Sequence, residues 1–254
     1  MNLQPRKARL EERQVIASAL GDTPESVISV HLFARALAEA YVAGDPTRPD
    51  GIIVQGGSDL GELMSFGSDA AVLWELLRLV EGWWCVSVVE PCAEDLGTMI
   101  EAQTGSRVRY YGDIYHILKG PVARLHSEDT RLLTPDDLEL VEAAPAEVRG
   151  SGWSSSQEML EEGVVAGTVV KGNLVAIAFT SARSARYADV AVSTLERWRG
   201  RGFAAAAASL VARHVQEVGQ IPVWSTGEDN RASQRVAQKL GFTPIARRIY
   251  VIRD

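Results

Sequence analysis

The chain has 254 residues, of which 46% are hydrophobic and 23% charged, and its formal net charge is −7. This length and apolar content suffice for a sizeable core or two modest domains and exclude a disordered or fibrous chain. The acidic balance argues against a general nucleic-acid binder, and two cysteines without a Cys/His cluster predict neither a disulfide framework nor a metal site.

The N-terminal region gives no targeting signal. No apolar run reaches the roughly 18 residues of a membrane span, and the charged segment 1–13 lacks the apolar core of a signal peptide. We therefore expect a cytoplasmic protein that acts on small molecules or peptides, without a membrane or nucleic-acid partner. The oligomeric state stays open, a homodimer included.

The first half of the chain predicts alternating helices and strands. Apolar residues at helical spacing predict helices at 3–19 and 26–42, and the Asp- and Pro-rich segment 44–50 ends the second. Beyond it the pattern predicts strands at 51–55 and 61–66, a helix at 69–81 capped by Asp69, a strand at 83–89, a helix at 93–104 and a strand at 109–118.

A linker at 121–129 separates this half from the second. The next signals predict a strand at 131–133, a helix to 143 with Thr134 as N-cap, and a mobile loop at 148–156. The remaining elements are strands at 163–170 and 174–181 joined by a tight hairpin, a strand at 188–194, a helix at 205–217, a strand at 221–225, a helix at 232–240 and a strand at 245–252.

The order of elements in the first half recurs in the second. The strands predicted at the end of each half also look related, with Tyr115 in the first and Tyr250 in the second, offset by 250 − 115 = 135 positions. We infer an internal duplication, the alternative being that two halves of alternating strands and helices merely look alike.

The segment Arg199-Gly200-Arg201-Gly202-Phe203-Ala204 lies between a predicted strand and an alanine-rich helix. A glycine at 202 lets the backbone turn sharply, and the helix start offers unpaired N–H groups with the positive end of the helix dipole. The sequence therefore predicts an anion site at this turn, although a Gly-Arg-Gly turn also occurs in ordinary strand-to-helix loops.

Three segments together resemble the GNAT superfamily of acyl-CoA-dependent N-acyltransferases over 130–254. Arg199-x-x-Gly202-x-Ala204 is similar to the pyrophosphate-binding signature of that superfamily. The run from Asn230 to Phe242, ending in Leu-Gly-Phe, is similar to its helix that begins near a CoA-contacting Asn, and 190–194 is similar to its central splayed strand.

The resemblance implies an α/β fold with a mixed sheet and acetyl-CoA, or another acyl-CoA, as co-substrate. The residues that it assigns to CoA binding are Val190, Ala191, Val192, Arg199, Gly200, Arg201, Gly202, Phe203, Ala204, Asn230 and Ser233. The two arginine side chains either contact a phosphate or are solvated. Trp153 is a candidate for contact with the acceptor, its alternative being an aromatic lid over the core.

Acyl transfer to an amine needs a base for the amine, a donor to the carbonyl oxygen and a proton or stabilising neighbour for the thiolate. Asp189 is the first candidate for the base and Glu228 the second, against the alternative of a solvated aspartate at a strand edge. The tyrosine that members of the superfamily place seven residues after the motif Asn corresponds to Ala237, so the acid stays unassigned.

The turn before the helix in the first half, Phe66-Gly67-Ser68-Asp69, has neither paired glycines nor arginines. We therefore predict a smaller, degenerate GNAT-like domain at 1–120 and an N-acyltransferase domain at 130–254. The expected activity is transfer of an acyl group to a primary amine of a small molecule, and the alternative is a non-catalytic acyl-CoA-binding or sensing protein.

Overall fold

The computed structural model describes residues 4–57 and 59–254. Its internal contacts divide the chain into two compact units. The first unit holds the N-terminal segment to Asp22, Ser29–Ile114 and Ala246–Asp254, and the second holds Thr23–Ile28 and Tyr115–Ile245. The last strand of the chain therefore belongs largely to the first unit.

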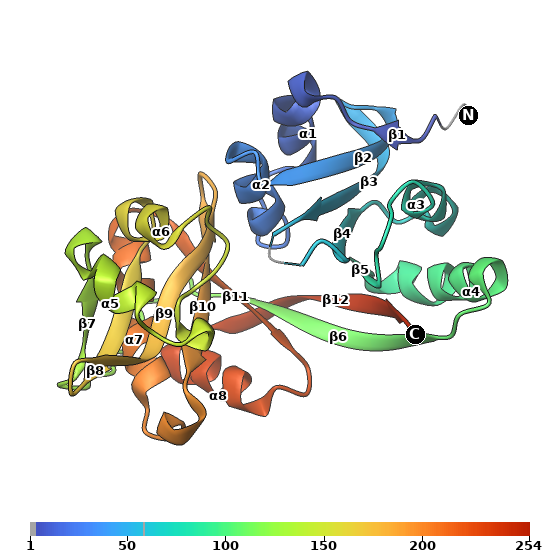
Figure 1. Cartoon of the computed structure of the whole chain (residues 1–254). Coiled ribbons are helices and arrows are strands. Elements are labelled where there is room, and N and C mark those ends of the chain that lie inside the picture. Colours follow the sequence, from blue (N-terminus) through green and yellow to red (C-terminus); the bar gives the residue numbers. More distant parts are fainter. Residues whose placement is uncertain (1–3, 58) are drawn as a thin grey trace. The chain divides into compact units, whose positions relative to one another are not determined.

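In the first unit, helices pack on a mixed sheet in the strand order β1-β2-β3-β4-β5-β12-β6. Its elements, labelled in Figure 1, are β1 (Arg6–Lys7), η1 (Leu10–Glu12), α1 (Arg13–Leu20), α2 (Val27–Ala34), β2 (Ala38–Asp45), β3 (Arg48–Gly56), β4 (Glu62–Phe66), α3 (Ala70–Leu77), β5 (Cys85–Val89), η2 (Glu90–Cys92), α4 (Ala93–Thr104), β6 (Val108–Ile117) and the end of β12 (Thr243–Arg253).

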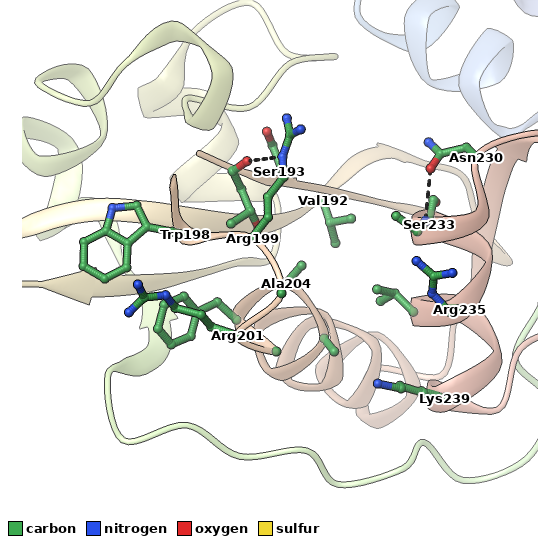
Figure 2. A pocket seen from close by; sticks show the side chains of 17 residues that line it. Val192, Ser193, Trp198, Arg199, Arg201, Ala204, Asn230, Ser233, Arg235 and Lys239 are labelled. Carbon is green, nitrogen blue, oxygen red and sulfur yellow. Dashed lines mark hydrogen bonds between the residues drawn. The ribbon is translucent and has the colours of Figure 1, made fainter. Parts of the chain in front are cut away.

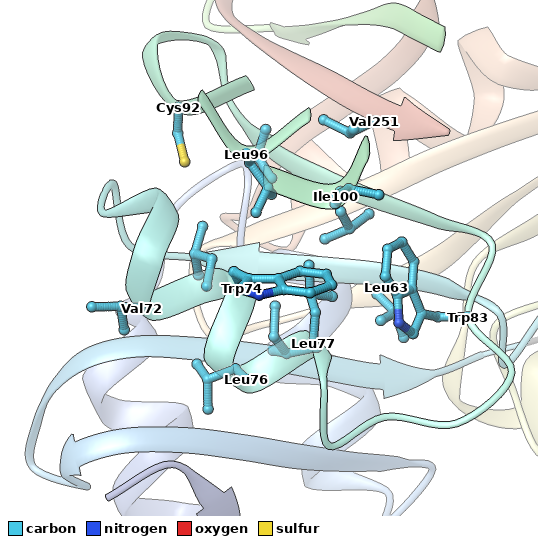
Figure 3. Close-up of a cluster of buried hydrophobic side chains, with 14 of the residues drawn as sticks. Leu63, Val72, Trp74, Leu76, Leu77, Trp83, Cys92, Leu96, Ile100 and Val251 are labelled. Carbon is cyan, nitrogen blue, oxygen red and sulfur yellow. The ribbon is translucent and has the colours of Figure 1, made fainter. Parts of the chain in front are cut away.

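One large apolar cluster holds the first unit together. Helix α3 contributes Leu76 and Leu77, α4 contributes Leu96 and Ile100, and β12 contributes Val251, all fully buried (Figure 3). Asp69 caps α3 by accepting hydrogen bonds from the amides of Ala71 and Val72 at 2.9 and 3.2 Å, as the sequence predicts for a helix N-cap.

In the second unit the strand order is β6-β11-β10-β9-β8-β7, and β10 and β11 are the parallel pair. Its further elements are β7 (Thr130–Leu133), η3 (Pro135–Asp137), α5 (Leu138–Glu142), η4 (Ala146–Val148), α6 (Ser156–Glu162), β8 (Val165–Val170), β9 (Asn173–Arg183), β10 (Tyr187–Thr194), η5 (Glu196–Trp198), α7 (Phe203–Glu217), β11 (Ile221–Gly227) and α8 (Arg231–Leu240).

The two faces of this sheet carry different cores. Ile177 and Phe179 of β9 pack in a cluster with α5 and α6, while Ala178, between them, packs in the cluster of α7 and α8. This alternation is the period-two pattern of a strand. Alanines of the sheet face the buried alanines of α7, such as Ala207 and Ala208. Small side chains on both surfaces let this helix lie close to the strands.

Most predicted elements are found in the structure, with three corrections. The helix predicted at 3–19 begins only at Arg13, after β1 and η1, and Leu3 lies outside the described residues. The helix predicted at 26–42 ends at Ala34. Residue Ala36 has a positive φ of 57°, and Ala38–Asp45 is β2, paired with β3. The third correction is α6, missed at the end of the predicted loop 148–156, with Ser155 as its N-cap.

The predicted linker packs against α7. The amide of Leu125 donates to Oγ of Ser209 at 3.1 Å, and that hydroxyl donates to the carbonyl of Ala123 at 2.7 Å. The predicted domains place 246–254 in the second domain, whereas the contacts place this segment in the first unit. The division into a GNAT-like domain at 1–120 and an N-acyltransferase domain at 130–254 stays a prediction.

None of the helices in the described ranges is both long and apolar enough to cross a membrane.

Candidate active site

Strands β10 and β11 separate after a short parallel ladder. Tyr187–Asp189 pair with Ile221–Val223, but β10 continues to Thr194 and β11 to Gly227 without further pairing between them. On its other side β10 stays paired with β9 as far as Thr194, and a bulge between Asp189 and Val190 leaves Ser181 of β9 unpaired. The splayed central strand predicted from the sequence is confirmed.

The turn after β10 leaves the start of α7 without a cap. Gly202 occupies the N-cap position with φ 83°, in the left-handed region, and Gly200 has φ 77°. A Cβ at either position would meet no protein atom within 4 Å. Among the described residues, the amides of 201–205 have no protein acceptor, and the first helical bond is that of the Ala206 amide to the carbonyl of Gly202 at 3.0 Å. These amides are available to an anion.

A cavity of about 530 Å³ lies against this turn, within the range of small-molecule sites. Its wall, shown in Figure 2, is formed by the end of β10, the turn, the first residues of α7 and one face of α8. Its lining comprises Val192, Ser193, Thr194, Trp198, Arg199, Gly200, Arg201, Gly202, Phe203, Ala204, Ala205, Asn230, Ala232, Ser233, Arg235, Val236 and Lys239. The lining holds four cationic side chains and no carboxylate.

The two arginines of the turn are held by neighbouring groups. Nε of Arg199 donates to the carbonyl of Thr194 at 3.3 Å. The guanidinium of Arg201 lies over the ring of Trp198, 4.7 Å from its centroid, and that ring packs against Phe203 at 6.1 Å. In Figure 2 Arg201 points toward Trp198, away from α8. The main chain of the turn, rather than these side chains, therefore faces the cavity with unpaired donors.

Asn230 and Ser233 line the cavity and also order α8. Oδ1 of Asn230 caps the helix by accepting from the amide of Ser233 at 3.1 Å. Oγ of Ser233 accepts from Nε1 of the buried Trp224 at 2.9 Å. The cap leaves the side-chain amide of Asn230 as the group that can still donate.

Three predicted residues at the splay lie outside the cavity lining. Val190 is 3% exposed and packs in the cluster of α7, and Ala191 packs on the opposite face against the cluster of α5 and α6. Asp189 is 5% exposed, and its Oδ2 accepts a hydrogen bond from the hydroxyl of Ser181. Desolvation raises the pKa of Asp189 to about 6, against the opposing effect of that hydrogen bond.

Glu228 and Trp153 also lie outside the lining. Glu228 is half-buried just after β11, and its carbonyl accepts from the side chain of Gln234 at 2.8 Å. The indole N–H of Trp153 donates to the carbonyl of Thr180 at 2.7 Å, and the ring packs against the cluster of α5 and α6. This packing is that of the lid over the core; a contact of Trp153 with the acceptor stays a prediction.

Among the described residues, three buried side-chain polar atoms have no hydrogen-bond partner. They are Oδ1 of Asp189, Oγ1 of Thr194 and Nε1 of Trp198. All three lie in the ten-residue stretch that forms the splay and leads into the turn. Buried polar groups in native proteins are normally hydrogen-bonded, so three unpaired groups in one short stretch indicate a functional role for this stretch.

Sequence reasoning missed part of the lining. Arg235 and Lys239 reach the cavity from α8, and Trp198 from η5. The signal for the first two was available, because residues four apart on a helix share a face, but it needed the fold to show that this face meets α7. Ala237, on the same helix, is fully buried in the core and does not line the cavity.

Comparisons with solved structures show the same architecture over the whole chain. A GCN5-related N-acetyltransferase-like protein from Streptococcus suis has 22% identity and a TM-score of 0.70, over 97% of this chain and all of the other. A putative GNAT acetyltransferase from Novosphingobium aromaticivorans has 20% identity and a TM-score of 0.59, over 91% of this chain and 98% of the other. A tandem GNAT protein from the clavulanic acid biosynthesis pathway has 15% identity and a TM-score of 0.59, over 98% of each chain.

No curated protein sequence matches the chain. The family model described as GNAT acetyltransferase matches residues 116–249, which is more than half of the sequence. The neighbours extend the likeness through the first unit, which agrees with the GNAT-like first half inferred from the repeated order of elements. This chain belongs to the GNAT acetyltransferase family.

Proposed function

We propose that the protein is an N-acyltransferase that moves an acyl group, most simply acetyl, from CoA to a primary amine of a small molecule. The observation that carries the proposal is the uncapped start of α7, where the amides of 201–205 lack protein acceptors beside a cavity that opens onto the splayed strand β10. The membership of the chain in an acetyltransferase family supports it.

The groups of this wall fit a diphosphate. Gly200 and Gly202 hold backbone conformations that favour glycine and leave the space before the amides open. The positive end of the α7 dipole and the four cations add to the attraction for an anion. The main chain of β10 beyond Asp189, freed from β11, is placed to donate to the acyl carbonyl as negative charge develops there.

For the base we propose Asp189, with Glu228 as the second candidate. With a pKa of about 6 the Asp189 carboxyl is ionised at neutral pH, and its Oδ1 has no partner among the described residues. Since Asp189 does not line the cavity, the proton of the amine would reach it through Ser181 or water. No acid is assigned, and a thiolate can leave without a dedicated donor.

We also propose that the amine attacks the thioester directly, in a ternary complex of the protein with both substrates. Orientation of the two substrates then supplies much of the rate acceleration. Contact of Trp153 with the acceptor and a cytoplasmic location are parts of the same proposal.

Thiol release from acetyl-CoA with a panel of small primary amines tests the proposal. The expected result is release that depends on an amine and is matched mole for mole by N-acetylated product, with a reaction lacking amine as the control for hydrolysis. If acetyl-CoA does not bind in calorimetry, the cofactor assignment is wrong.

The second candidate is a non-catalytic acyl-CoA-binding or sensing protein. Two observations favour it, namely the buried alanine at 237 and the position of Asp189 outside the cavity lining. Tight binding of acetyl-CoA without turnover of any amine would support this second function.

A further inference from the structure

We propose that Arg235 and Lys239 of α8 form a second anion subsite, which binds the 3′-phosphate of the nucleotide half of acyl-CoA. This inference rests on the proposed function and adds to it a selection for CoA over its dephospho form. The subsite would be distinct from the main-chain donors of the turn at 199–204, which suit the diphosphate.

The charge pattern of α8 is the first support. Arg231, Arg235 and Lys239 follow one another at four-residue spacing, and the helix Arg231–Leu240 contains no Asp or Glu. Like charges at this spacing repel each other, so the arrangement is unfavourable to the helix unless an anion lies against it. Arg235 and Lys239 line the cavity, whereas Arg231 does not.

The second support concerns the hydrogen-bond and ion-pair partners of these two side chains. Neither Arg235 nor Lys239 makes an ion pair or hydrogen bond with any described residue, and both are exposed. In Figure 2 Lys239 extends from α8 toward α7, whereas the guanidinium of Arg235 lies over α8; both residues line the cavity. The arginines of the turn differ, because Arg199 is bonded to a carbonyl and Arg201 is stacked on Trp198. The cations of α8 are therefore the ones free to meet a ligand.

The chemistry of the ligand matches two mobile cations. A phosphomonoester carries between about −1.5 and −2 charges at neutral pH and three acceptor oxygens. Arg235 and Lys239 are one helical turn apart, roughly 6 Å along the axis, so two long side chains can meet on one phosphate. A guanidinium and an ammonium bind phosphate by charge-assisted hydrogen bonds.

The first half of the chain provides an internal comparison. Helix α4, at the corresponding place in the repeated order of elements, carries Glu94, Asp95 and Glu101 and no Lys or Arg. The basic face is therefore a property of α8 and not of this element in both halves. It occurs in the unit with the uncapped glycine turn and is missing from the unit without one.

The test is calorimetry of the full chain with acetyl-CoA and with dephospho-acetyl-CoA. We expect the wild type to bind acetyl-CoA at least about tenfold more tightly, the size expected for losing a charge-assisted contact. Arg235→Gln/Lys239→Gln should bind both compounds with affinities within about twofold of each other. Arg231→Gln is the matched control, because it removes the same charge from the same helix outside the cavity and should keep the wild-type preference.

Each outcome decides the inference. Equal binding of the two compounds by the wild type, an unchanged preference in the double variant, or an equal loss in Arg231→Gln would overturn the subsite while leaving acyl-CoA binding intact. Failure of the wild type to bind either compound would instead overturn the proposed function itself. Circular dichroism of the double variant shows whether it is folded, and the two single variants provide the same comparison if it is not.

Discussion

Gly202 is the residue on which the proposed phosphate site depends most directly. We predict that Gly202→Val loses acetyl-CoA binding by more than about tenfold, because a side chain would stand in front of the amides, and that it loses about 1–2 kcal/mol of stability through the positive φ. Calorimetry and urea unfolding measure the two effects.

Gly219 provides the matched control. It has φ 82°, and a Cβ there would also meet nothing within 4 Å, but it lies after α7 and outside the cavity lining. Gly219→Val should lose a similar stability and keep its acetyl-CoA affinity. An unchanged affinity in Gly202→Val would place the diphosphate elsewhere.

The raised pKa of Asp189 predicts that the free energy of unfolding depends on pH. Its pKa is about 6 in the folded chain, against 3.8 as the ordinary value, so the folded state binds the proton more tightly between these values. The free energy of unfolding should therefore fall as the pH rises through this window, by about 3 kcal/mol, and level off above it.

The comparison of wild type with Asp189→Asn isolates this effect. Urea unfolding at several pH values between about 4 and 7 should show a fall in the wild type that the variant lacks. Asp129→Asn, which changes an exposed carboxylate, serves as the control and should retain the fall. Parallel pH profiles for wild type and Asp189→Asn would contradict the burial of a titrating carboxyl.

At the scale of single residues, the sequence predicts the features that depend on neighbours along the chain. The positive φ of Gly202 and the cap by Asn230 follow from residue type and local order. The burial of Asp189 depends on Ser181 in another strand, and the place of Arg235 depends on how α8 meets α7. Side chains brought together by tertiary packing leave no mark in local spacing.

At the scale of elements, the starts of α3 and α7 differ in whether a side chain caps the helix. Asp69 caps α3 with its carboxylate and occupies two of the amides that an anion would need. Gly202 leaves those of α7 unoccupied. A negative charge at the first helix start would repel the anion that we propose for the second.

In the first unit, side-chain hydrogen bonds connect the parallel strands β4 and β5 beyond the end of their ladder. In the second unit, β10 and β11 separate at the corresponding place. The last pair of the β4–β5 ladder is Met64 with Ser87. Beyond it, Oγ of Ser65 donates to the carbonyl of Ser87 at 2.8 Å, and the buried guanidinium of Arg248 donates to the carbonyls of Ser65 and Ser87 at 2.6 and 2.9 Å. These bonds bridge β4 and β5 at the place that corresponds to the proposed position of the acyl-CoA arm in the second unit.

We therefore predict that one chain binds about one acetyl-CoA. Titration calorimetry with acetyl-CoA gives the stoichiometry, and Gly202→Val, which changes only the second unit, should leave no site with the wild-type affinity. A stoichiometry near two in the wild type, or one site of wild-type affinity remaining in Gly202→Val, would show that the first unit also binds the cofactor.

Elements with a single strong pattern were predicted well, and those under competing influences were not. Helix α4 runs over Ala93–Thr104, as its periodicity indicated. Residues 38–42 were included in the predicted helix but belong to β2 (Ala38–Asp45), because pairing with β3 buries most of the side chains of this strand and outweighs a weak local preference. The short α6 follows a serine- and glycine-rich loop, and its cap at Ser155 was the only local signal.

At the scale of the whole molecule, the repeat was visible in the sequence but the return of the C-terminus was not. The end of β12 pairs with β5, with Ile249 opposite Val88 and Val251 opposite Val86. Both side chains are buried in the core of the first unit. A pairing between segments some 160 positions apart cannot be inferred from periodicity, because the strand pattern shows only that a partner exists.

This pairing predicts that residues 1–120 do not fold stably alone. The fragment lacks Ile249 and Val251, each worth about 1.5–3 kcal/mol when buried, and leaves the edge of β5 unpaired. Fusing 246–254 to it through a flexible linker should restore cooperative urea unfolding, followed by circular dichroism. The matched control is the same fusion with Ile249→Asp and Val251→Asp, which keeps the length and removes the apolar contacts. Cooperative unfolding of 1–120 with the stability of the fusion would show instead that the first half is complete without its C-terminal strand.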